Sequence, residues 1–298
     1  MKIAAIDIGG TEIKYAWFSE YGDILLQGII PTGLISSGIQ LVKKVSDIIR
    51  DMGSFDLIGV STAGQINPIT GTVIYANEII KGYTGTNVKS MLENTFKVPV
   101  TVDNDVNNAA IGEAHFGSGK NFYNFLCITY GTGVGGAIIL NREIYYGHLF
   151  SAGEFGHIIT HVNGIICNCG NRGCYESYAS VSALLKVVLI RTGKNLNGKE
   201  LFEYITSGKS LYKEILDEWI EEVMAGLASL IHIFNPECII LGGGIMKENY
   251  VISRIQERIP QILMSNYREV QILKAGLGNN ASLYGALFKS LKGERSNC

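Results

Sequence analysis

Apolar residues along the chain follow two spacings, and each spacing predicts a different kind of element. Apolar positions near the N-terminus predict strands at residues 2–7, 13–18 and 24–30, because glycine-containing turns separate them. From residue 39 to 52 the spacing becomes helical, with Leu41, Val45 and Ile49 on one face. The chain therefore opens with a three-stranded meander that is followed by an amphipathic helix.

The opening pattern appears a second time after residue 120. Strands are predicted at 125–129 and 135–140, with Gly131-Thr132-Gly133 between them and a turn at 141–143. The first meander has Gly9-Gly10-Thr11 in the matching place. Two such units about 120 residues apart indicate an internal duplication.

The rest of the chain mixes short apolar strands with helices. We expect strands at 57–61, 100–102 and 238–241 and helices at 106–115 and 282–291, with a helix-rich region over 180–234. This mixture predicts an α/β protein. A Gly-Ser-Gly-Lys segment at Gly117–Lys120 interrupts the pattern and marks the expected domain boundary.

Composition excludes several classes of partner. The 298 residues carry a formal net charge of −2, so no basic excess predicts binding to nucleic acid or to an anionic membrane. An apolar run starts directly after Met1-Lys2, which is typical of a strand and not of a secretory leader. The longest apolar stretch, 223–245, is interrupted by His232, Asn235 and Glu237. We therefore expect a cytoplasmic protein with neither a membrane nor a nucleic-acid partner.

The two glycine–threonine turns are candidate phosphate sites. Glycine lets the backbone approach a ligand, and successive amide groups form a concave site for anions. Either turn alone is also compatible with a plain tight hairpin, but two in equivalent places could hold a triphosphate from both sides. Asp7 precedes the first turn inside an apolar strand, where an acid is costly without a partner. A Mg²⁺ ion or its waters would be one partner, and capping of the next turn is the alternative.

A polar cluster follows the predicted strand at 100–102. It comprises Asp103, Asn104, Asp105, Asn107 and Asn108. Ligands of α/β proteins bind at the carboxyl ends of strands. A helix N-cap would account for one of these residues but not for all five. A carboxylate here could take a proton from a sugar hydroxyl, and the amides suit sugar hydroxyls as partners.

One imidazole and three thiols form the most specific pattern in the chain: His157, Cys167, Cys169 and Cys174. A Cys₃His set leaves no position for water, so the pattern predicts a structural zinc site. His161 is a competing ligand. Glu154 and Glu176 flank the set, and we expect the metal to fix these two carboxylates as acceptors for sugar hydroxyls.

A third glycine segment, Gly242-Gly243-Gly244, follows the strand predicted at 238–241. Without side chains it could lie flat against an adenine or a ribose. A strand-to-helix turn accounts for it equally well.

With these residues assembled, the chain resembles the ROK family of bacterial sugar kinases and repressors over residues 1 to about 290. The glycine turns recur throughout the wider actin-like ATPase superfamily, whereas the Glu-x-Gly-His element with the cysteine cluster is more specific. The matching stretches are Asp7–Thr11 with Lys14, Val102–Glu113, Gly131–Gly136, Glu154–His157, Cys167–Cys174 with Glu176, and Leu241–Gly244.

The resemblance implies two actin-like ATPase (ribonuclease H-like) α/β domains around a central cleft. The final helix would return to the first domain, which gives domains 1–117 plus 282–298 and 118–281. Family members are commonly dimers, so a homodimer is expected. The helix-turn-helix module of the repressors does not fit before a strand that begins at residue 2.

The resemblance also implies roles for individual residues. Asp105 would be the general base, and His157 would both bind zinc and approach the sugar. The further sugar contacts would be Asn77, Asn104, Glu154 and Glu176, although the segment around Asn77 departs from the usual Pro-Asn of the family. The nucleotide contacts would be Asp7, Gly9, Gly10, Thr11, Lys14, Thr132 and Gly133, with Gly243 near the adenosine.

These inferences predict a kinase that moves the γ-phosphate of ATP, with Mg²⁺ and a structural Zn²⁺, onto a hydroxyl of a hexose-type sugar. O6 is the expected acceptor atom, and glucose, N-acetylmannosamine or a β-glucoside are compatible sugars. Two alternatives stay open. One is a non-catalytic sugar sensor of the same fold, and the other is an actin-like or chaperone-like ATPase that moves a partner.

Overall fold

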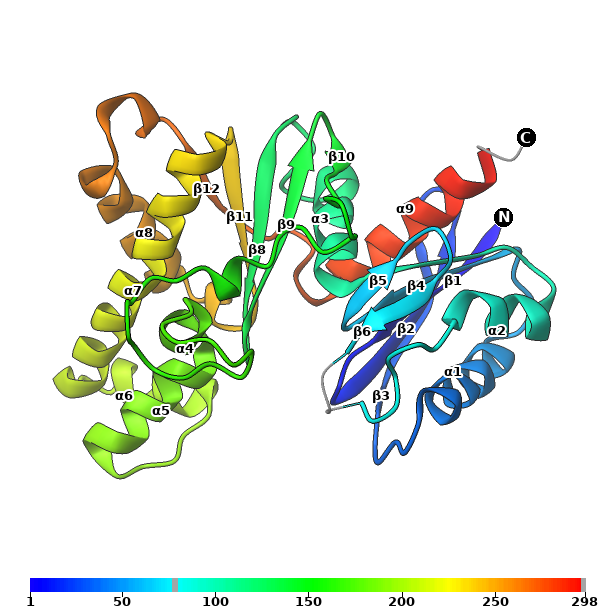
Figure 1. The fold of residues 1–298 in the computed structure, drawn as a ribbon, viewed down its shortest axis with the longest axis horizontal. Coiled ribbons are helices and arrows are strands. Elements are labelled where there is room, and N and C mark those ends of the chain that lie inside the picture. The colour runs from blue at the N-terminus through cyan, green and yellow to red at the C-terminus, as the bar shows by residue number, and fades with distance from the viewer. Residues whose placement is uncertain (77–79, 296–298) are drawn as a thin grey trace. The chain divides into compact units, whose positions relative to one another are not determined.

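A computed structural model describes residues 1–76 and 80–295 of the chain (Figure 1). The chain divides into two compact units. The first comprises residues 1–121, 143–152 and 276–298, and the second comprises 122–142 and 153–275. Residues 118–121, 143–152 and 276–281 thus belong to the first unit, whereas the boundaries expected from the sequence place them in the second domain.

The first unit is built on a five-stranded sheet in the order β3-β2-β1-β4-β7. β1 pairs antiparallel with β2 and parallel with β4, and β4 pairs parallel with β7. Every strand predicted for this region is present. The elements are β1 (Lys2–Ile8), β2 (Glu12–Ser19), β3 (Ile24–Pro31), α1 (Gly38–Met52), β4 (Leu57–Thr62), β5 (Gln65–Asn67), β6 (Thr72–Tyr75), α2 (Val88–Phe96), β7 (Val100–Asn104), α3 (Asp105–Phe116), β10 (Glu143–Ile144) and α9 (Ala281–Arg295).

Helices cover both faces of this sheet (Figure 1). Side chains alternate across a strand, so β1 sends Ile6 toward the core formed with α1 and Ile3 toward the core formed with α9. Leu41 of α1 and Leu287 of α9 are fully buried in these two cores. Burying one such side chain contributes about 1.5–3 kcal/mol. The near-continuous apolar sequence of β1 therefore follows from its central place in a three-layer unit.

Two glycines allow α3 and α9 to pack in backbone contact. A Cβ added at Gly285 of α9 would lie 1.8 Å from the carbonyl oxygen of Asn108, and one added at Gly112 would lie 2.2 Å from that of Ala281. Backbone atoms cannot move aside as flexible side chains do, so these positions require glycine. The close packing fixes the C-terminal helix against the helix that begins at Asp105.

The second unit repeats the strand order of the first. β9-β8-β11-β12 matches β2-β1-β4-β7, because β8 is antiparallel to β9 and parallel to β11, and β11 is parallel to β12. The internal duplication expected from the sequence is thus present in the topology. The elements are β8 (Phe125–Tyr130), β9 (Val134–Leu140), α4 (Glu176–Ala179), α5 (Val181–Thr192), α6 (Gly198–Thr206), α7 (Ser210–Phe234), β11 (Cys238–Gly242), α8 (Asn249–Ile262) and β12 (Gln271–Lys274).

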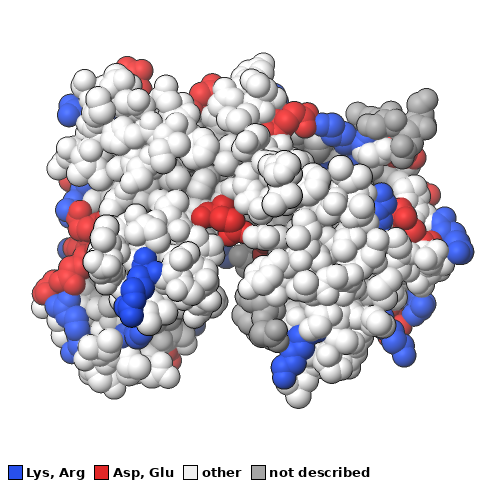
Figure 2. Space-filling view, in the orientation of Figure 1, with Lys and Arg blue, Asp and Glu red and all other residues white. Residues whose placement is uncertain are grey.

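Charged side chains are scattered over the face shown in Figure 2, with Lys and Arg interspersed among Asp and Glu. Of the helices within residues 1–76 and 80–295, none combines the length and the apolar character that crossing a bilayer requires.

Candidate active site

The first glycine–threonine turn joins β1 to β2 and is held by hydrogen bonds to Glu12 of β2 and to Thr32, the residue after β3. The Gly9 amide donates to the carbonyl of Glu12 at 2.9 Å, and the Thr32 hydroxyl donates to the carbonyl of Gly9 at 2.7 Å. The Thr32 amide also donates to the carbonyl of Thr11 at 2.8 Å. This turn therefore has a defined backbone conformation before any ligand arrives.

Asp7 lies beside this turn and finds its partners across the sheet. The register pairs Asp7 with Lys14 on β2 and with Ser61 on β4. Ser61 donates to Oδ1 at 2.8 Å, and Lys14 Nζ lies 3.4 Å from Oδ2. These partners were not anticipated from the sequence, because only strand pairing brings Ser61 beside an acid 54 positions away.

The polar cluster after β7 divides into a helix cap and a carboxylate. The Asn104 side chain caps α3 by accepting from the amides of Val106 and Asn107 at 2.8 and 3.0 Å. Its amide nitrogen donates to the Gly64 carbonyl and to Asp105 Oδ1, both at 2.9 Å. Asn104 is thus the N-cap that the sequence offered as an alternative. All four of its hydrogen-bonding positions are used within the first unit.

Asp105 is the first residue of α3, and its carboxylate lies at the positive end of that helix. Its Oδ1 accepts from Asn104 and, at 3.0 Å, from the Val106 amide. Two causes raise the pKa of Asp105 to about 7. Burial of the carboxylate is the larger cause, and the negative charge of Asp7 is the second. A carboxylate with a pKa near neutrality is suited to general base chemistry.

In the second unit, the matching turn between β8 and β9 contacts Glu176. The Gly131 amide donates to the Gly133 carbonyl at 3.0 Å, and the Gly131 carbonyl accepts from Val181 at 2.9 Å. Glu176 Oε2 accepts from the Val134 amide at 3.4 Å. A Cβ at Gly133 would lie 2.6 Å from that oxygen, so the glycine makes room for the carboxylate.

The four predicted metal ligands meet in this unit. One ligand atom from each of His157, Cys167, Cys169 and Cys174 lies within 4.8 Å of the others. His157 Nδ1 is 3.8 Å from Cys167 Sγ, and Cys169 Sγ is 3.5 Å from Cys174 Sγ. The competing His161 stacks on Tyr178 instead. A soft Cys₃His donor set with atoms this close fits a tetrahedral Zn²⁺.

The same cluster contacts the two flanking acids. Cys167 Sγ donates to Glu176 Oε1 at 3.3 Å, and that oxygen lies 4.0 Å from His157 Nδ1. His157 Nε2 lies 3.9 Å from Glu154 Oε2. His157 therefore presents one ring nitrogen to the thiols and the other toward Glu154. The metal-ligand cluster, both acids and the second turn are thus joined within one unit.

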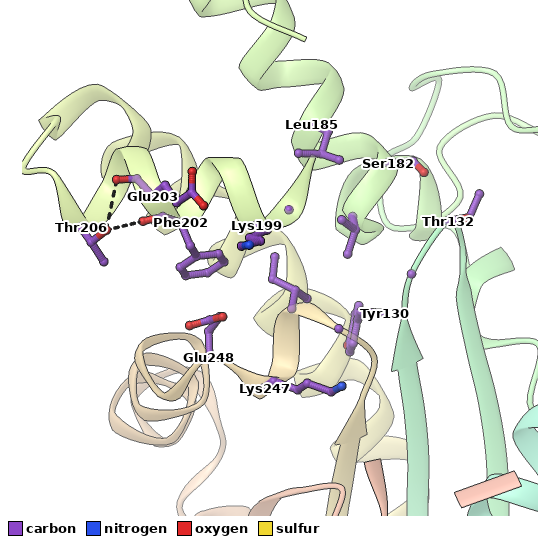
Figure 3. A pocket seen from close by; sticks show the side chains of 15 residues that line it. Tyr130, Thr132, Ser182, Leu185, Lys199, Phe202, Glu203, Thr206, Lys247 and Glu248 are labelled. Atoms are coloured by element: carbon purple, nitrogen blue, oxygen red, sulfur yellow. Dashed lines mark hydrogen bonds between the residues drawn. The ribbon is translucent and has the colours of Figure 1, made fainter. Parts of the chain in front are cut away.

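A cavity of about 880 Å³ opens beside the second turn (Figure 3). Such a volume suits a ligand of nucleotide size. The lining of the cavity comes from three parts of the second unit. They are the turn that carries Thr132, the helices α5 and α6 with apolar and charged side chains, and a short segment after β11. The lining residues are Tyr130, Gly131, Thr132, Val181, Ser182, Leu185, Gly198, Lys199, Phe202, Glu203, Thr206, Gly244, Ile245, Lys247 and Glu248.

Sequence reasoning missed most of this cavity. The residues on α5 and α6 that line the cavity form no recognisable motif, so nothing in their spacing marks them. Gly243 is not among the lining residues, whereas its neighbour Gly244 is. Gly243 has φ +102°, and a Cβ there would lie 2.0 Å from the Tyr130 carbonyl oxygen, so its backbone conformation requires glycine.

The structure thus brings the predicted residues together in two groups. The first unit holds Asp7, Gly9, Gly10, Thr11, Lys14, Asn104 and Asp105, and the second holds Thr132, Gly133, Glu154, His157, Glu176, Gly243 and the three cysteines. Asn77 lies outside the described residues.

Comparison with known proteins identifies the class to which this fold and these sites belong. The chain is a member of the ROK family, whose profile matches residues 3–291.

A glucokinase of Streptomyces coelicolor is 34% identical, with 94% of this chain and 95% of the relative covered. A β-glucoside kinase of Listeria innocua is 30% identical, with 99% of each chain covered. A solved ROK family glucokinase of Streptomyces griseus, in complex with glucose and AMPPNP, superposes with a TM-score of 0.87 at 30% identity, over 98% of this chain and 100% of that one.

The structural match confirms the fold class expected from the sequence, which is α/β with actin-like ATPase domains.

Proposed function

We propose that this protein is an ATP-dependent sugar kinase that transfers the γ-phosphate of ATP to O6 of a hexose-type sugar. The similarity to a glucokinase and a β-glucoside kinase over nearly the whole chain supports the class of reaction. The observation that carries the proposal for this chain is the placement of Asp105, a carboxylate at the start of α3 whose Oδ1 is held by Asn104 and the Val106 amide, and whose pKa burial raises to about 7.

Asp105 is the proposed general base. The hydrogen bonds from Asn104 and from the Val106 amide both end on Oδ1, so Oδ2 is the oxygen that faces a substrate hydroxyl. Near neutral pH about half of these carboxylates are ionised, and their basicity is high enough to accept a proton from the attacking hydroxyl. Asn104 fixes the carboxylate in this orientation.

The proposed nucleotide site is the cavity beside the second turn. A cavity of about 880 Å³ has room for an adenosine, and Thr132 in its lining is the proposed contact to the phosphates. Each of the two glycine–threonine turns offers backbone amides that suit phosphate oxygens. Asp7 provides the hard carboxylate oxygens that Mg²⁺ prefers, and the bound ion would neutralise charge on the transferred phosphoryl group. Lys14, 3.4 Å from Asp7, offers a second positive charge there.

The proposed sugar contacts of the second unit are Glu154, His157 and Glu176. Glu154 and Glu176 lie directly beside the ligands His157 and Cys167, so a zinc ion on the four ligands would fix the backbone segments that carry both carboxylates. His157 would bind zinc through Nδ1 and leave Nε2 for a sugar hydroxyl. The zinc supplies structure and no chemistry, because its four protein ligands leave no open position.

The reaction then proceeds by alignment and charge stabilisation. Asp105 accepts the proton of the O6 hydroxyl as O6 forms a bond to the γ-phosphorus, and the bond from that phosphorus to the β–γ bridging oxygen breaks. ADP leaves with the bond electrons, and the sugar 6-phosphate forms. The turns hold the phosphates in line with the hydroxyl, which is the main requirement of phosphoryl transfer.

A coupled ADP-release assay tests the proposal with glucose, N-acetylmannosamine, mannose, fructose, allose and a β-glucoside as acceptors. The wild-type protein should release ADP only when one of these sugars is present. Asp105→Asn should lower kcat by roughly 10²–10⁴-fold and leave the sugar KM nearly unchanged, because the amide cannot accept the proton.

Asp51→Asn, an exposed acid at the end of α1, is the matched control and should retain wild-type activity. An Asp105→Asn enzyme that turns over at the wild-type rate contradicts the assignment of the base. Sugar binding without any ADP release would instead favour the sugar sensor, and ADP release without sugar would favour a partner-moving ATPase. The homodimer and the cytoplasmic location stay predictions.

A further inference from the structure

Two side chains from separate parts of the first unit meet at one oxygen of a buried acid, Asp103. Tyr146, two residues after β10, donates its hydroxyl to Asp103 Oδ2 at 2.6 Å. Lys289 of α9 forms an ion pair with the same oxygen and also donates to the Tyr146 hydroxyl at 2.9 Å. Asp103 is 0% exposed, so its charge depends on these two partners.

The other oxygen of Asp103 is bound to the start of α3. Oδ1 accepts from the Asn104 amide at 2.7 Å and from the Asn107 side chain at 3.3 Å. The Asn104 side chain in turn donates to Asp105 Oδ1. Hydrogen bonds therefore connect Lys289 and Tyr146 to Asp103, and Asp103 to the backbone amide of Asn104. The side chain of this same Asn104 binds the carboxylate of the proposed base.

The packing of α9 fixes one end of this series. Gly285 lies in backbone contact with Asn108 of α3, and Lys289 lies one helical turn further along the same face of α9. Tyr146 is fixed as well, because its carbonyl accepts from the Ala152 amide at 3.1 Å. Burial, followed by the negative charge of Asp103, raises the pKa of Tyr146, so its hydroxyl keeps the proton that it donates.

Stability alone does not account for this arrangement. A buried ion pair is often replaced by apolar residues of similar volume at no cost in stability. Here the polar groups are directed at the first turn of the helix that carries Asp105. We propose that Lys289 and Tyr146 are positioning residues that hold Asp105 in its reactive orientation through Asp103 and Asn104. This inference rests on the proposed sugar kinase activity.

Tyr146→Phe tests the inference most directly, because it keeps the ring and removes only the hydroxyl that binds Asp103. We expect kcat to fall about 10-fold, while the KM values for sugar and for ATP stay within about twofold of wild type, since outer hydrogen bonds of this kind affect orientation more than binding. Tyr145→Phe, an exposed neighbour, is the matched control and should leave kcat unchanged.

The charge is tested at Lys289. Lys289→Met should lower kcat at least as much as Tyr146→Phe does. Lys289→Arg should retain most of the wild-type kcat because it keeps the positive charge. Lys292 lies on the same helix as Lys289 and forms an exposed ion pair with Glu143, so Lys292→Met serves as the control. All rates are measured well below the melting temperature of each variant. Should Lys289→Met fail to fold, Tyr146→Phe alone decides.

Two failures are distinguishable in this design. If the wild-type protein releases no ADP with any sugar, the proposed function is wrong. If the wild-type protein is active and Tyr146→Phe matches it in kcat, or if kcat and both KM values change in parallel, the positioning role is wrong.

Discussion

The two strand–turn–strand repeats share a topology but differ in chemistry at equivalent positions. Asp7 of β1 corresponds to Thr129 of β8, each two residues before its turn. The register places Lys14 and Ser61 beside Asp7, whereas it places Gly135 and Gly242 beside Thr129. One repeat therefore carries charge at this point, and the other carries only small neutral residues.

Under the proposed function, this difference predicts a division of labour between the two turns in phosphate binding. The first repeat has a carboxylate and an ammonium group that can handle a metal ion and negative charge. The second repeat has glycines beside the turn, and its cavity accepts a bulky ligand. The duplicated fold thus supplies two backbone turns of the same kind, and the side chains at matched positions differ in charge.

The largest effect is expected when the charge of the first repeat is removed. Asp7→Asn should lower kcat by about 10²–10³-fold and raise the KM for Mg-ATP, because the amide is a poor replacement for a carboxylate that holds Mg²⁺. Steady-state kinetics with sugar at saturation measures both parameters. The matched substitution in the second repeat, Thr129→Ser, should change either parameter less than about threefold.

Equal losses from Asp7→Asn and Thr129→Ser would contradict the division of labour between the repeats. A large loss from Thr129→Ser alone would reverse it.

A smaller effect is expected from the metal-ligand cluster, which has no counterpart in the first repeat among residues 1–76 and 80–121. Cys169→Ser should abolish stoichiometric zinc, measured by metal analysis of the purified protein. Sugar kcat/KM should fall about 10–100-fold, because Glu154 and Glu176 lose their rigid support. The melting temperature should also fall, by about 2–4 °C for each kcal/mol lost.

Cys238→Ala is the control for this experiment, since Cys238 is a buried thiol on β11 outside the cluster. The zinc content of the Cys238→Ala protein should stay at the wild-type value. A wild-type protein without zinc, together with unchanged melting of Cys169→Ser, would show that the cluster is not a metal site.

The smallest effect is expected in the pH dependence of kcat/KM, which should show whether the charge of Asp7 in the first repeat influences the proposed base Asp105. Since the pKa of Asp105 is about 7 and the base must be ionised, kcat/KM should fall about tenfold for each pH unit below neutrality. The charge of Asp7 contributes to the raised pKa, so in Asp7→Asn this acid limb should move to lower pH. Asp51→Asn should leave it in place. An acid limb at the same pH in Asp7→Asn and wild type would show that the two carboxylates are not coupled.

The sign for stability follows from the same pKa. Because the pKa of Asp105 rises from its ordinary value of 3.8 to about 7, the folded protein binds this proton more strongly than the unfolded chain does. Its contribution to stability is thus lost as pH rises through that window. Asp105→Asn should therefore melt at a higher temperature than wild type at about pH 8 and show little difference near pH 4.

Much of the fold was predictable from local pattern. The period of the apolar residues located every strand of the first sheet, and the glycine turns revealed the duplication. The pattern did not reveal the short hairpin β5–β6, the helix α2 or the strand β12, because these elements are short. The helix α8 was not predicted either, although its buried Val251, Ile255 and Ile259 recur at helical spacing.

The sequence by itself determined which groups carry the chemistry: a polar cluster after a buried strand, two glycine turns and a Cys₃His set at metal-binding spacing. Only the tertiary structure decided which member of each group is free to act. Asn104 is occupied by helix capping, Asp103 by Lys289 and Tyr146, and His161 by stacking on Tyr178. The proposed roles therefore fall on Asp105, whose Oδ1 alone accepts the hydrogen bonds from Asn104 and Val106, and on His157, which lies among the three thiols. Strand register and helix packing join residues far apart in the chain, and no local pattern records which of them will meet.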